Sequence, residues 1–228
     1  MYKINQLIIV FIFLSASSNA QFNKIDIGIH GGLGISNIYG HTNLFNPTKL
    51  NTPTVGISLC LGINDYFNLV SNLSYETKGD KFIGVPLTDD FGNGVGSGNK
   101  SLKFNYTTLN LLARGVIGRN LKFFANGGPF VGYLLNVKEI SKVDNPINVN
   151  GSYYTGSNRD ITTNFKKIDF GVTAGIGVIY PANYKYKFSF EVRRNIGLHN
   201  LSKLPMIDNG TLKTNSIGIL AGIKLELF

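Results

Sequence analysis

The residues of this chain best suited to acid–base chemistry are its three histidines, His30, His41 and His199. A histidine that hydrogen-bonds to a serine, and is itself oriented by an acid, activates that serine as a nucleophile. His199 is followed by Ser202 and Asp208, which makes such a set conceivable. Serine, histidine and aspartate are also ordinary residues of polar loops, and the three histidines lie in different segments. We therefore predict no catalytic residue and no metal site, and keep hydrolysis as an alternative.

A phosphate-binding loop is the second chemical possibility, since residues 94–101 read GVGSGNKS. Asn99 stands where that motif needs a glycine, and the motif must also follow a buried strand and open a helix. Residues 94–101 lie instead in a long polar stretch. A flexible loop is the better account, and we predict neither nucleotide binding nor any other cofactor.

The composition indicates a strand-rich protein in contact with something other than water. Charged residues make up only 15% of the chain, against about 25% in typical soluble domains, while 43% are hydrophobic and 27 are glycine. The formal net charge is +9, but lysine and arginine are dispersed without a long run, so we predict no nucleic-acid partner. Cys60 is the only cysteine, which excludes an internal disulfide and a cysteine metal cluster.

The start of the chain has the pattern of a removable export signal. A lysine precedes the apolar run 7–14 (LIIVFIFL), and Ala20 supplies the small residue expected before a cleavage site. The run is too short for a transmembrane helix, which needs about 20 apolar residues. Gln21 follows in place of a cysteine, so lipid attachment at that position is not expected. The predicted organisation is a signal peptide at 1–20 and one domain at 21–228.

Residues 168–180 alternate strictly in side-chain type. Apolar residues occupy the even positions, and small or polar residues such as Asp169 and Thr173 occupy the odd positions up to Gly177. A period of two over this length is typical of a strand whose two faces meet different surroundings. In a soluble sandwich the apolar face would point into the core. In a membrane barrel it points to lipid, and the polar face lines the lumen.

Eight segments of this kind are separated by connections that alternate between short and long. The short connections are 64–66, 118–120 and 181–183, and the long, polar ones are 37–52, 79–102, 136–165 and 199–213. Short turns at one end and long loops at the other are typical of outer-membrane barrels. The sequence therefore predicts an all-β fold: an eight-stranded antiparallel up-and-down transmembrane β-barrel with short periplasmic turns and long external loops. The predicted strands are 24–36, 53–63, 67–78, 103–117, 121–135, 166–180, 184–198 and 214–228.

The alternation also assigns side chains to the lipid or to the lumen. Leu109, Leu111 and Ala113 are placed outward, whereas His30 and Lys187 are placed inward. An eight-stranded barrel is just wide enough for its own side chains to fill, so inward charges of both signs should pair and close the lumen. We therefore predict a barrel that does not conduct. The predicted inward charge network consists of Asp26, Glu76, Arg114, Lys167, Asp169, Glu191 and Arg193.

Five short segments carry a family resemblance, and they are spread over nearly the whole region after the leader in the expected order. They are 31–37 (GGLGISN), 73–79 (LSYETKG), 128–135 (GPFVGYLL), 165–171 (FKKIDFG) and 193–198 (RRNIGL). By these segments the chain resembles the small outer-membrane β-barrel proteins of Bacteroidetes, the porin-family or PorT-like group. The resemblance implies a barrel in the cell outer membrane. It also implies a secretion-system assembly as one setting, because the member that names the group is tied to protein export across that membrane.

Two positions depart from the pattern of that family. Arg194 stands where members often carry an aromatic residue, and its outward register would place the charge near the external rim, where it costs little. The sequence ends on Phe228, as many barrels recognised by the assembly machinery do, but Leu225 and Leu227 fall in the opposite register from it. We expect an assembly signal there all the same.

The predicted function is that of an integral outer-membrane protein that is not an enzyme and acts through external loops or within an envelope or secretion assembly. Its expected partners are outer-membrane lipid and lipopolysaccharide, the barrel-assembly machinery, and secretion-system or envelope proteins. The alternatives are a lipid-modifying enzyme that uses His199 and a small-solute porin. Loops 79–102 and 136–165 are the longest and carry aromatic residues among polar ones, which suits binding. The candidate contact residues are Phe82, Phe91, Tyr153 and Tyr154.

Overall fold

The computed structural model describes residues 24–40, 47–88, 92, 94–149, 152–205 and 210–227. The predicted signal peptide, His41, Phe91, Asp208 and Phe228 lie outside these residues. Among the residues that are described, no helix is long and apolar enough to cross a bilayer. The elements are β1 (Lys24–Tyr39), β2 (Pro47–Gly62), β3 (Phe67–Thr88), β4 (Gly94–Ile117), β5 (Lys122–Val149), β6 (Ser152–Asp160), the 3₁₀-helix η1 (Thr162–Asn164), β7 (Ile168–Pro181), β8 (Tyr186–Gly197) and β9 (Lys213–Glu226).

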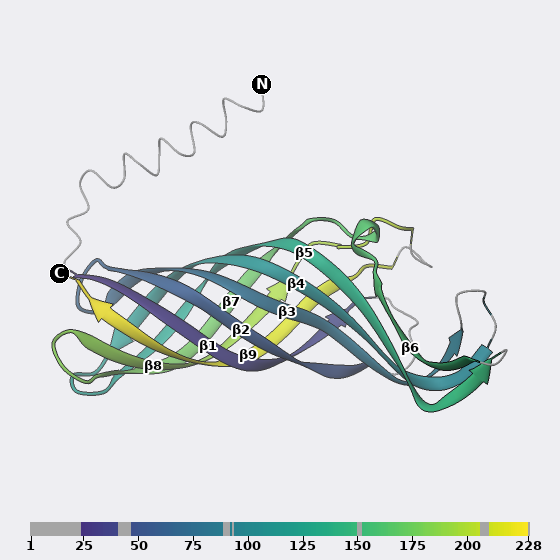
Figure 1. Cartoon of the computed structure of the whole chain (residues 1–228). Coiled ribbons are helices and arrows are strands. Elements are labelled where there is room, and N and C mark those ends of the chain that lie inside the picture. The colour runs from purple at the N-terminus through teal and green to yellow at the C-terminus, as the bar shows by residue number, and fades with distance from the viewer. Residues whose placement is uncertain are drawn as a thin grey trace, which may run out of the picture.

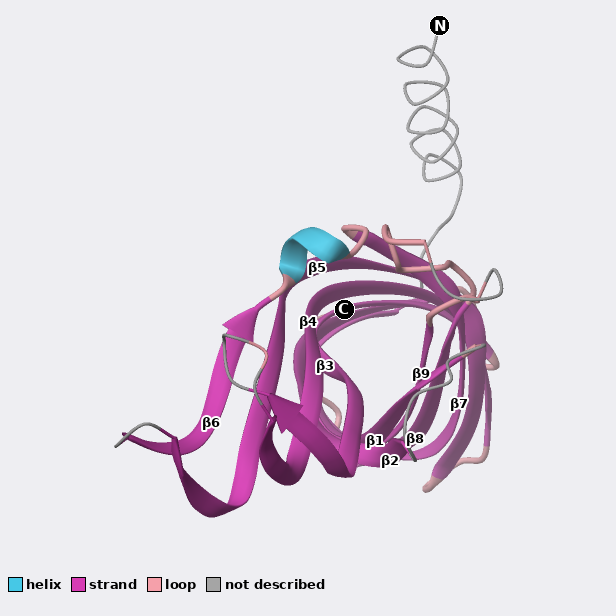
Figure 2. Cartoon of the chain, turned by 90° about the vertical axis from the view of Figure 1, so that its right-hand side faces the viewer, coloured by secondary structure: helices cyan, strands magenta, loops and turns pink. Residues whose placement is uncertain are grey.

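Eight of the strands close into a ring. All the pairings are antiparallel, and β1 pairs with β2 on one side and with β9 on the other, so the sheet has no edge there. The order around the ring is β1-β2-β3-β4-β5-β7-β8-β9, and β6 lies outside it on the far side of β5 (Figure 2). The eight-stranded up-and-down barrel predicted from the sequence is confirmed.

The barrel exposes its apolar residues and buries its polar ones. In β7, Ile168, Phe170 and Val172 are exposed, whereas Asp169 and Thr173 are buried. The predicted outward positions Leu109, Leu111 and Ala113 in β4 are exposed as well. This distribution is the inverse of a soluble sandwich, and it suits strands that face lipid outside and each other's polar side chains inside.

Turn chemistry explains two of the short connections. The Asn64 side chain accepts hydrogen bonds from the backbone N–H groups of Tyr66 and Phe67, at 2.9 and 2.8 Å. The Asn183 side chain does the same for Lys185 and Tyr186, at 2.9 and 2.7 Å. Asparagine stabilises a turn in this way because its short amide reaches the backbone two residues further on.

Outward-facing polar residues mark the external end of the apolar surface. On one side of the barrel, Thr77 donates to Asn105 and Asn105 donates to Asn136, at 2.8 and 2.7 Å. We call these three residues the polar row. On the opposite side, Asn215 donates to Asn37 at 2.9 Å and accepts from the exposed Arg194 at 3.2 Å. The membrane-spanning segments lie between these residues and the tyrosines of the periplasmic turns, including Tyr66 and Tyr184.

Two of the predicted long loops are wrong, because residues 79–102 and 136–165 consist largely of strand. β3 continues to Thr88, β4 begins at Gly94 and β5 continues to Val149, where β6 pairs with it. Residues 79–88, 94–103, 138–149 and 152–160 thus form a four-stranded sheet, which we call the extension and which projects beyond the barrel (Figure 1). Residues 94–101, predicted as a flexible loop, belong to its strand β4 and open no helix. The alternation of apolar and polar residues did not reveal these strands, because polar residues occupy both of their faces.

One glycine lies where β3 leaves the barrel. Gly79 has φ of +149°, and a Cβ at this position would lie 1.8 Å from the carbonyl oxygen of Leu102. The buried hydroxyl of Ser36 in β1 accepts from the Gly79 N–H at 2.9 Å and donates to its carbonyl at 3.0 Å. A side chain at position 79 would therefore disturb the contact that joins the barrel to the extension.

Candidate functional site

The lumen contains six of the seven predicted charges, in three clusters. The first lies at the periplasmic end, where the Lys187 ammonium is 2.7 Å from the carboxylates of both Asp26 and Glu226. β1, β8 and β9 bring these residues together. Lys224 is directly opposite Lys187 and is buried, so its charge compensates the formal net negative charge of this cluster.

The second cluster centres on Glu191 of β8. The Arg193 guanidinium donates to its two carboxylate oxygens at 2.7 and 3.0 Å, and Arg114 of β4 approaches from across the lumen at 3.5 Å. The Asn126 amide donates to the same carboxylate at 3.2 Å. The Arg114 guanidinium also lies over the ring of Phe124, 4.1 Å from its centroid. Two buried guanidinium groups therefore depend on one carboxylate.

The third cluster lies nearer the external end. The Lys78 ammonium is 3.7 Å from a Glu76 oxygen and 3.6 Å from an Asp169 oxygen. It lies 4.3 Å from the ring centroid of Phe130, which contributes a cation–π contact. Thr214 donates to Asp169 at 2.8 Å. This cluster carries a formal charge of minus one and the Glu191 cluster plus one, so the two compensate each other.

Sequence reasoning missed some of these residues and misplaced one. Lys78 is the last residue of the predicted strand 67–78 and has the same parity as the inward Glu76, so the alternation within that strand would have found it. Lys167 was predicted inside but is exposed. β7 begins only at Ile168, and the residue before it follows the rim, where the Lys167 carbonyl accepts from Leu134 N–H at 2.7 Å. The other six predicted charges are buried.

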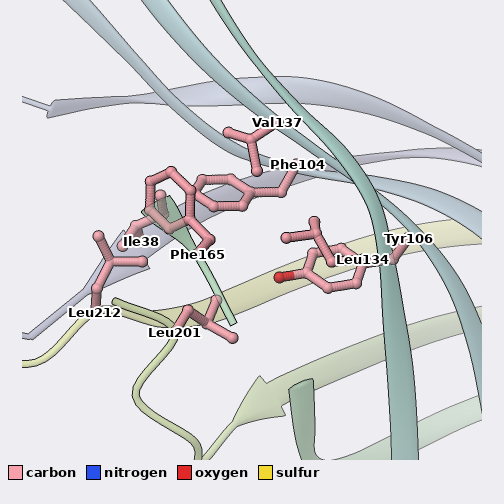
Figure 3. Close-up of a cluster of buried hydrophobic side chains, with 8 residues drawn as sticks. All are labelled: Ile38, Phe104, Tyr106, Leu134, Val137, Phe165, Leu201 and Leu212. Carbon is pink, nitrogen blue, oxygen red and sulfur yellow. The ribbon is translucent and has the colours of Figure 1, made fainter. Parts of the chain in front are cut away.

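A cluster of buried hydrophobic side chains, which we call the plug, lies at the external end of the lumen (Figure 3). Phe165, Leu201 and Leu212 come from the external connections and pack onto side chains of the barrel wall. Phe165 meets Phe104 edge-on, with ring centroids 4.8 Å apart. Backbone hydrogen bonds of 2.8 Å, from Lys166 N–H to the Leu201 carbonyl and from Leu201 N–H to the Leu212 carbonyl, tie the two connections together. The wall residues of the plug are Ile38, Phe104, Tyr106, Leu134 and Val137.

Two cavities lie among the described residues of the lumen. The cavity beside Glu76, Arg193 and Asn195 has a volume of about 20 Å³, which is room for a single water molecule. A larger cavity of about 240 Å³ opens at the periplasmic end, next to Asp26 and Lys187. The plug lies in the external half of the barrel, and the Glu191 cluster lies near its middle.

The histidines do not form a catalytic set in the described part of the chain. His30 faces the lumen as predicted, and its Nε2 is 3.0 Å from the Ser74 hydroxyl. The His199 ring stacks on Phe170, with centroids 5.0 Å apart. The Ser202 hydroxyl donates to the Leu204 carbonyl at 2.8 Å instead of to a histidine. Among the described residues, no group of three or more His, Cys, Asp and Glu side chains could hold a metal ion.

The structure also places the predicted contact residues. Phe82 is buried with Val85 in a small cluster on one face of the extension, so its prediction as a surface contact is wrong. An apolar residue in this sheet is covered because Leu102 and Val143 of the neighbouring strands pack against it. Tyr153 and Tyr154 lie in β6, opposite Asn148 and Ile147 of β5.

Asp80 is a buried carboxylate just beyond the polar row, where the extension begins. It is only 3% exposed, and its Oδ1 has no hydrogen-bond partner among the described residues. Burial raises the pKa of Asp80 to about 6, from an ordinary value of 3.8, and a hydrogen bond from the Ile38 N–H opposes this with a smaller effect.

Asp80 should make stability depend on pH. The folded protein binds this proton more tightly than the unfolded chain, so the contribution of Asp80 is fully present below about pH 4. It is lost as the pH rises through 6, at a cost of up to about 3 kcal/mol. Urea unfolding between pH 4 and 8 measures the slope, and Asp80→Asn should flatten it. Asp160→Asn is the control, because hydrogen bonds from Thr162 lower the pKa of that exposed carboxyl out of this window. An unchanged slope in Asp80→Asn would contradict the assignment.

Comparisons with known proteins agree with the barrel. A family model described as "Outer membrane protein beta-barrel domain" matches residues 19–203. The chain is similar in structure to Neisserial surface protein A, with 13% identity, a TM-score of 0.45, and coverage of 89% of this chain and 96% of that one. It is also similar to OprG of Pseudomonas aeruginosa, with 9% identity, a TM-score of 0.45, and coverage of 89% of this chain and 95% of that one. For the protease OmpT of Escherichia coli the identity is 8%, the TM-score is 0.44, and the coverage is 91% of this chain and 98% of that one. No curated protein sequence matches the chain. Because the family model spans most of its length, this protein belongs to the outer-membrane proteins that carry this β-barrel domain.

Proposed function

We propose that this protein is a closed barrel that holds the extension outside the cell as a binding surface, and that it is neither an enzyme nor a diffusion channel. The partner is a protein of an envelope or secretion assembly. The observation that carries the proposal is the extension itself, a sheet in which β3, β4 and β5 continue beyond the polar row and β6 is added at the edge.

The filled lumen supports the part of the proposal that concerns conduction. The plug covers the external mouth, and the Glu191 cluster crosses the middle of the barrel from β4 to β8. A hydrated solute would have to displace both, and breaking a buried ion pair costs about 3–5 kcal/mol. We therefore do not expect the barrel to transport hydrated solutes.

The edges of the extension support the part that concerns binding. β6 is the last strand of the sheet and pairs only with β5 in the described sheet. Beyond Phe82, where the pairing with Pro47 of β2 ends, β4 is the only partner of β3 among the residues that the structure describes. Both edges present backbone groups that can pair with a strand of another protein, as in recognition by strand addition.

A shortened protein tests this proposal. Lys81 is paired with Ser101, and Ser141 with Ser157, so replacing residues 82–100 and 142–156 by two-residue turns would close both hairpins in register. A photo-crosslinking residue at position 158, which is exposed in β6, should capture a protein partner in intact cells. An excess of unlabelled protein with the complete extension should compete for the partner and abolish the capture. The shortened protein should not compete.

Two controls accompany this experiment. The same crosslinking residue at position 119, exposed in the periplasmic turn, should not capture the external partner. Both proteins should show the heat-dependent gel shift of a folded barrel and no steady channels in planar bilayers. Competition by the shortened protein as strong as by the full chain, or steady passage of hydrated solutes, would refute the proposal.

A further inference from the structure

The outward face at the base of the extension carries an unusual pair of lysines. Lys103 of β4 lies directly opposite Lys138 of β5. Side chains paired in this way have Cβ atoms about 4.5–5.5 Å apart, and like charges at this distance destabilise a sheet. No carboxylate of the described residues lies within ion-pair distance of either ammonium, whereas Lys100 on the opposite face pairs with Glu139 at 2.8 Å.

The acid nearest to this pair is otherwise engaged. Asp160 of β6 is opposite Lys138, but its Oδ1 accepts from the backbone N–H of Thr162 at 2.9 Å and also from the Thr162 hydroxyl. The exposed Lys167, at the start of β7, acts electrostatically on the same carboxylate together with Lys138. Two lysines therefore act on one carboxylate that is already hydrogen-bonded, and with Lys103 opposite Lys138 the face keeps an excess of positive charge.

The height of these lysines matches the lipid headgroups. Lys103 and Lys138 are each two residues beyond the polar row, which is about 7 Å along the strand. The headgroup layer outside the hydrocarbon core is about 5–8 Å thick on each side of a bilayer. Below the polar row on the same strands, Tyr75, Tyr133 and Leu135 expose apolar surface. An occupant of this place must combine acyl chains below with an anionic group above.

We propose that Lys103 and Lys138, with Lys167 beside them, bind a phosphate group of a phosphorylated outer-leaflet glycolipid. A phosphate monoester carries nearly two negative charges and several acceptor oxygens, so one group can satisfy both ammonium groups and relieve their repulsion. The exposed apolar side chains below favour a lipid over a free anion, because they need acyl chains to cover them. This site is separate from the edges of the extension that take part in the proposed function.

The test uses the full mature chain in phosphatidylcholine vesicles, with or without bisphosphorylated lipid A. Lipid A should raise the temperature of the heat-dependent gel shift, and the concentration that gives half the effect should rise about thirtyfold in the double variant Lys103→Gln/Lys138→Gln. Without lipid A the double variant should be at least as stable as the parent, because the repulsion is gone. A loss of response can then not be ascribed to misfolding.

A matched control removes the same charge elsewhere. Lys122→Gln/Lys185→Gln changes two lysines at the periplasmic end and should respond to lipid A like the parent. The shortened protein keeps Lys103, Lys138 and Lys167, so it should lose the protein partner and retain the lipid response. An equal response to dephosphorylated lipid A, an equal loss in the periplasmic control, or the same stabilisation by inorganic phosphate alone would each overturn the proposal.

Discussion

Replacing Ile57 with arginine should cost about 2–4 kcal/mol of barrel stability. Ile57 in β2 is 58% exposed, and its paired neighbours Ile29 and Leu73 are exposed apolar residues as well. A guanidinium among them would lie in the hydrocarbon layer without a partner. Urea unfolding in phospholipid vesicles, followed by the heat-dependent gel shift, measures the cost.

The control for this prediction is the same substitution outside the membrane. Ile83 in the extension is 53% exposed, nearly as much as Ile57, but it lies beyond the polar row. Ile83→Arg should change stability by no more than about 0.5 kcal/mol. Equal costs at the two positions would mean that the apolar exterior does not face lipid. Ala174 in β7 is less suitable, because it lies directly opposite Arg194 and an arginine there would add repulsion between like charges.

The second large effect is expected inside the barrel, where Glu191→Gln should cost about 3–5 kcal/mol. This carboxylate is the partner of Arg193 at 2.7 Å and of Arg114 at 3.5 Å, and all three residues are buried. An amide in its place keeps the volume but leaves two buried guanidinium groups without an opposite charge. The same urea titration measures the effect.

Glu139→Gln is the matched control for the lumen. Glu139 pairs with Lys100 at 2.8 Å, a better distance than that between Glu191 and Arg114, but both partners are partly exposed in the extension. Water screens such a pair, so its loss should cost no more than about 1 kcal/mol. If the two Glu→Gln variants were equally stable, the lumen would have to be hydrated, and the closed barrel would be contradicted.

The barrel strands, their two faces and their short turns can be predicted from the amino-acid sequence alone. The alternation in residues 168–180 correctly separates exposed Phe170 from buried Asp169. Asn64 and Asn183 act on backbone groups two and three residues away. Both signals are local, because a strand repeats every two residues and an asparagine amide reaches only nearby N–H groups. Such features can be predicted from one sequence.

The pairing of the charges and the residues at the external mouth of the lumen follow from the three-dimensional fold and not from any local pattern. Lys78 lies between Glu76, two residues away, and Asp169, which is far along the chain, and Asn195 donates to Glu76 across 119 residues. These contacts depend on how the strands are staggered when the sheet closes into a barrel, and no local pattern encodes that stagger. The plug residue Leu201 and the strands of the extension were hidden for a related reason. Their segments are rich in polar residues, which indicates that they are exposed to water. A polar composition does not show whether the backbone of a segment pairs with a strand that is distant in the sequence.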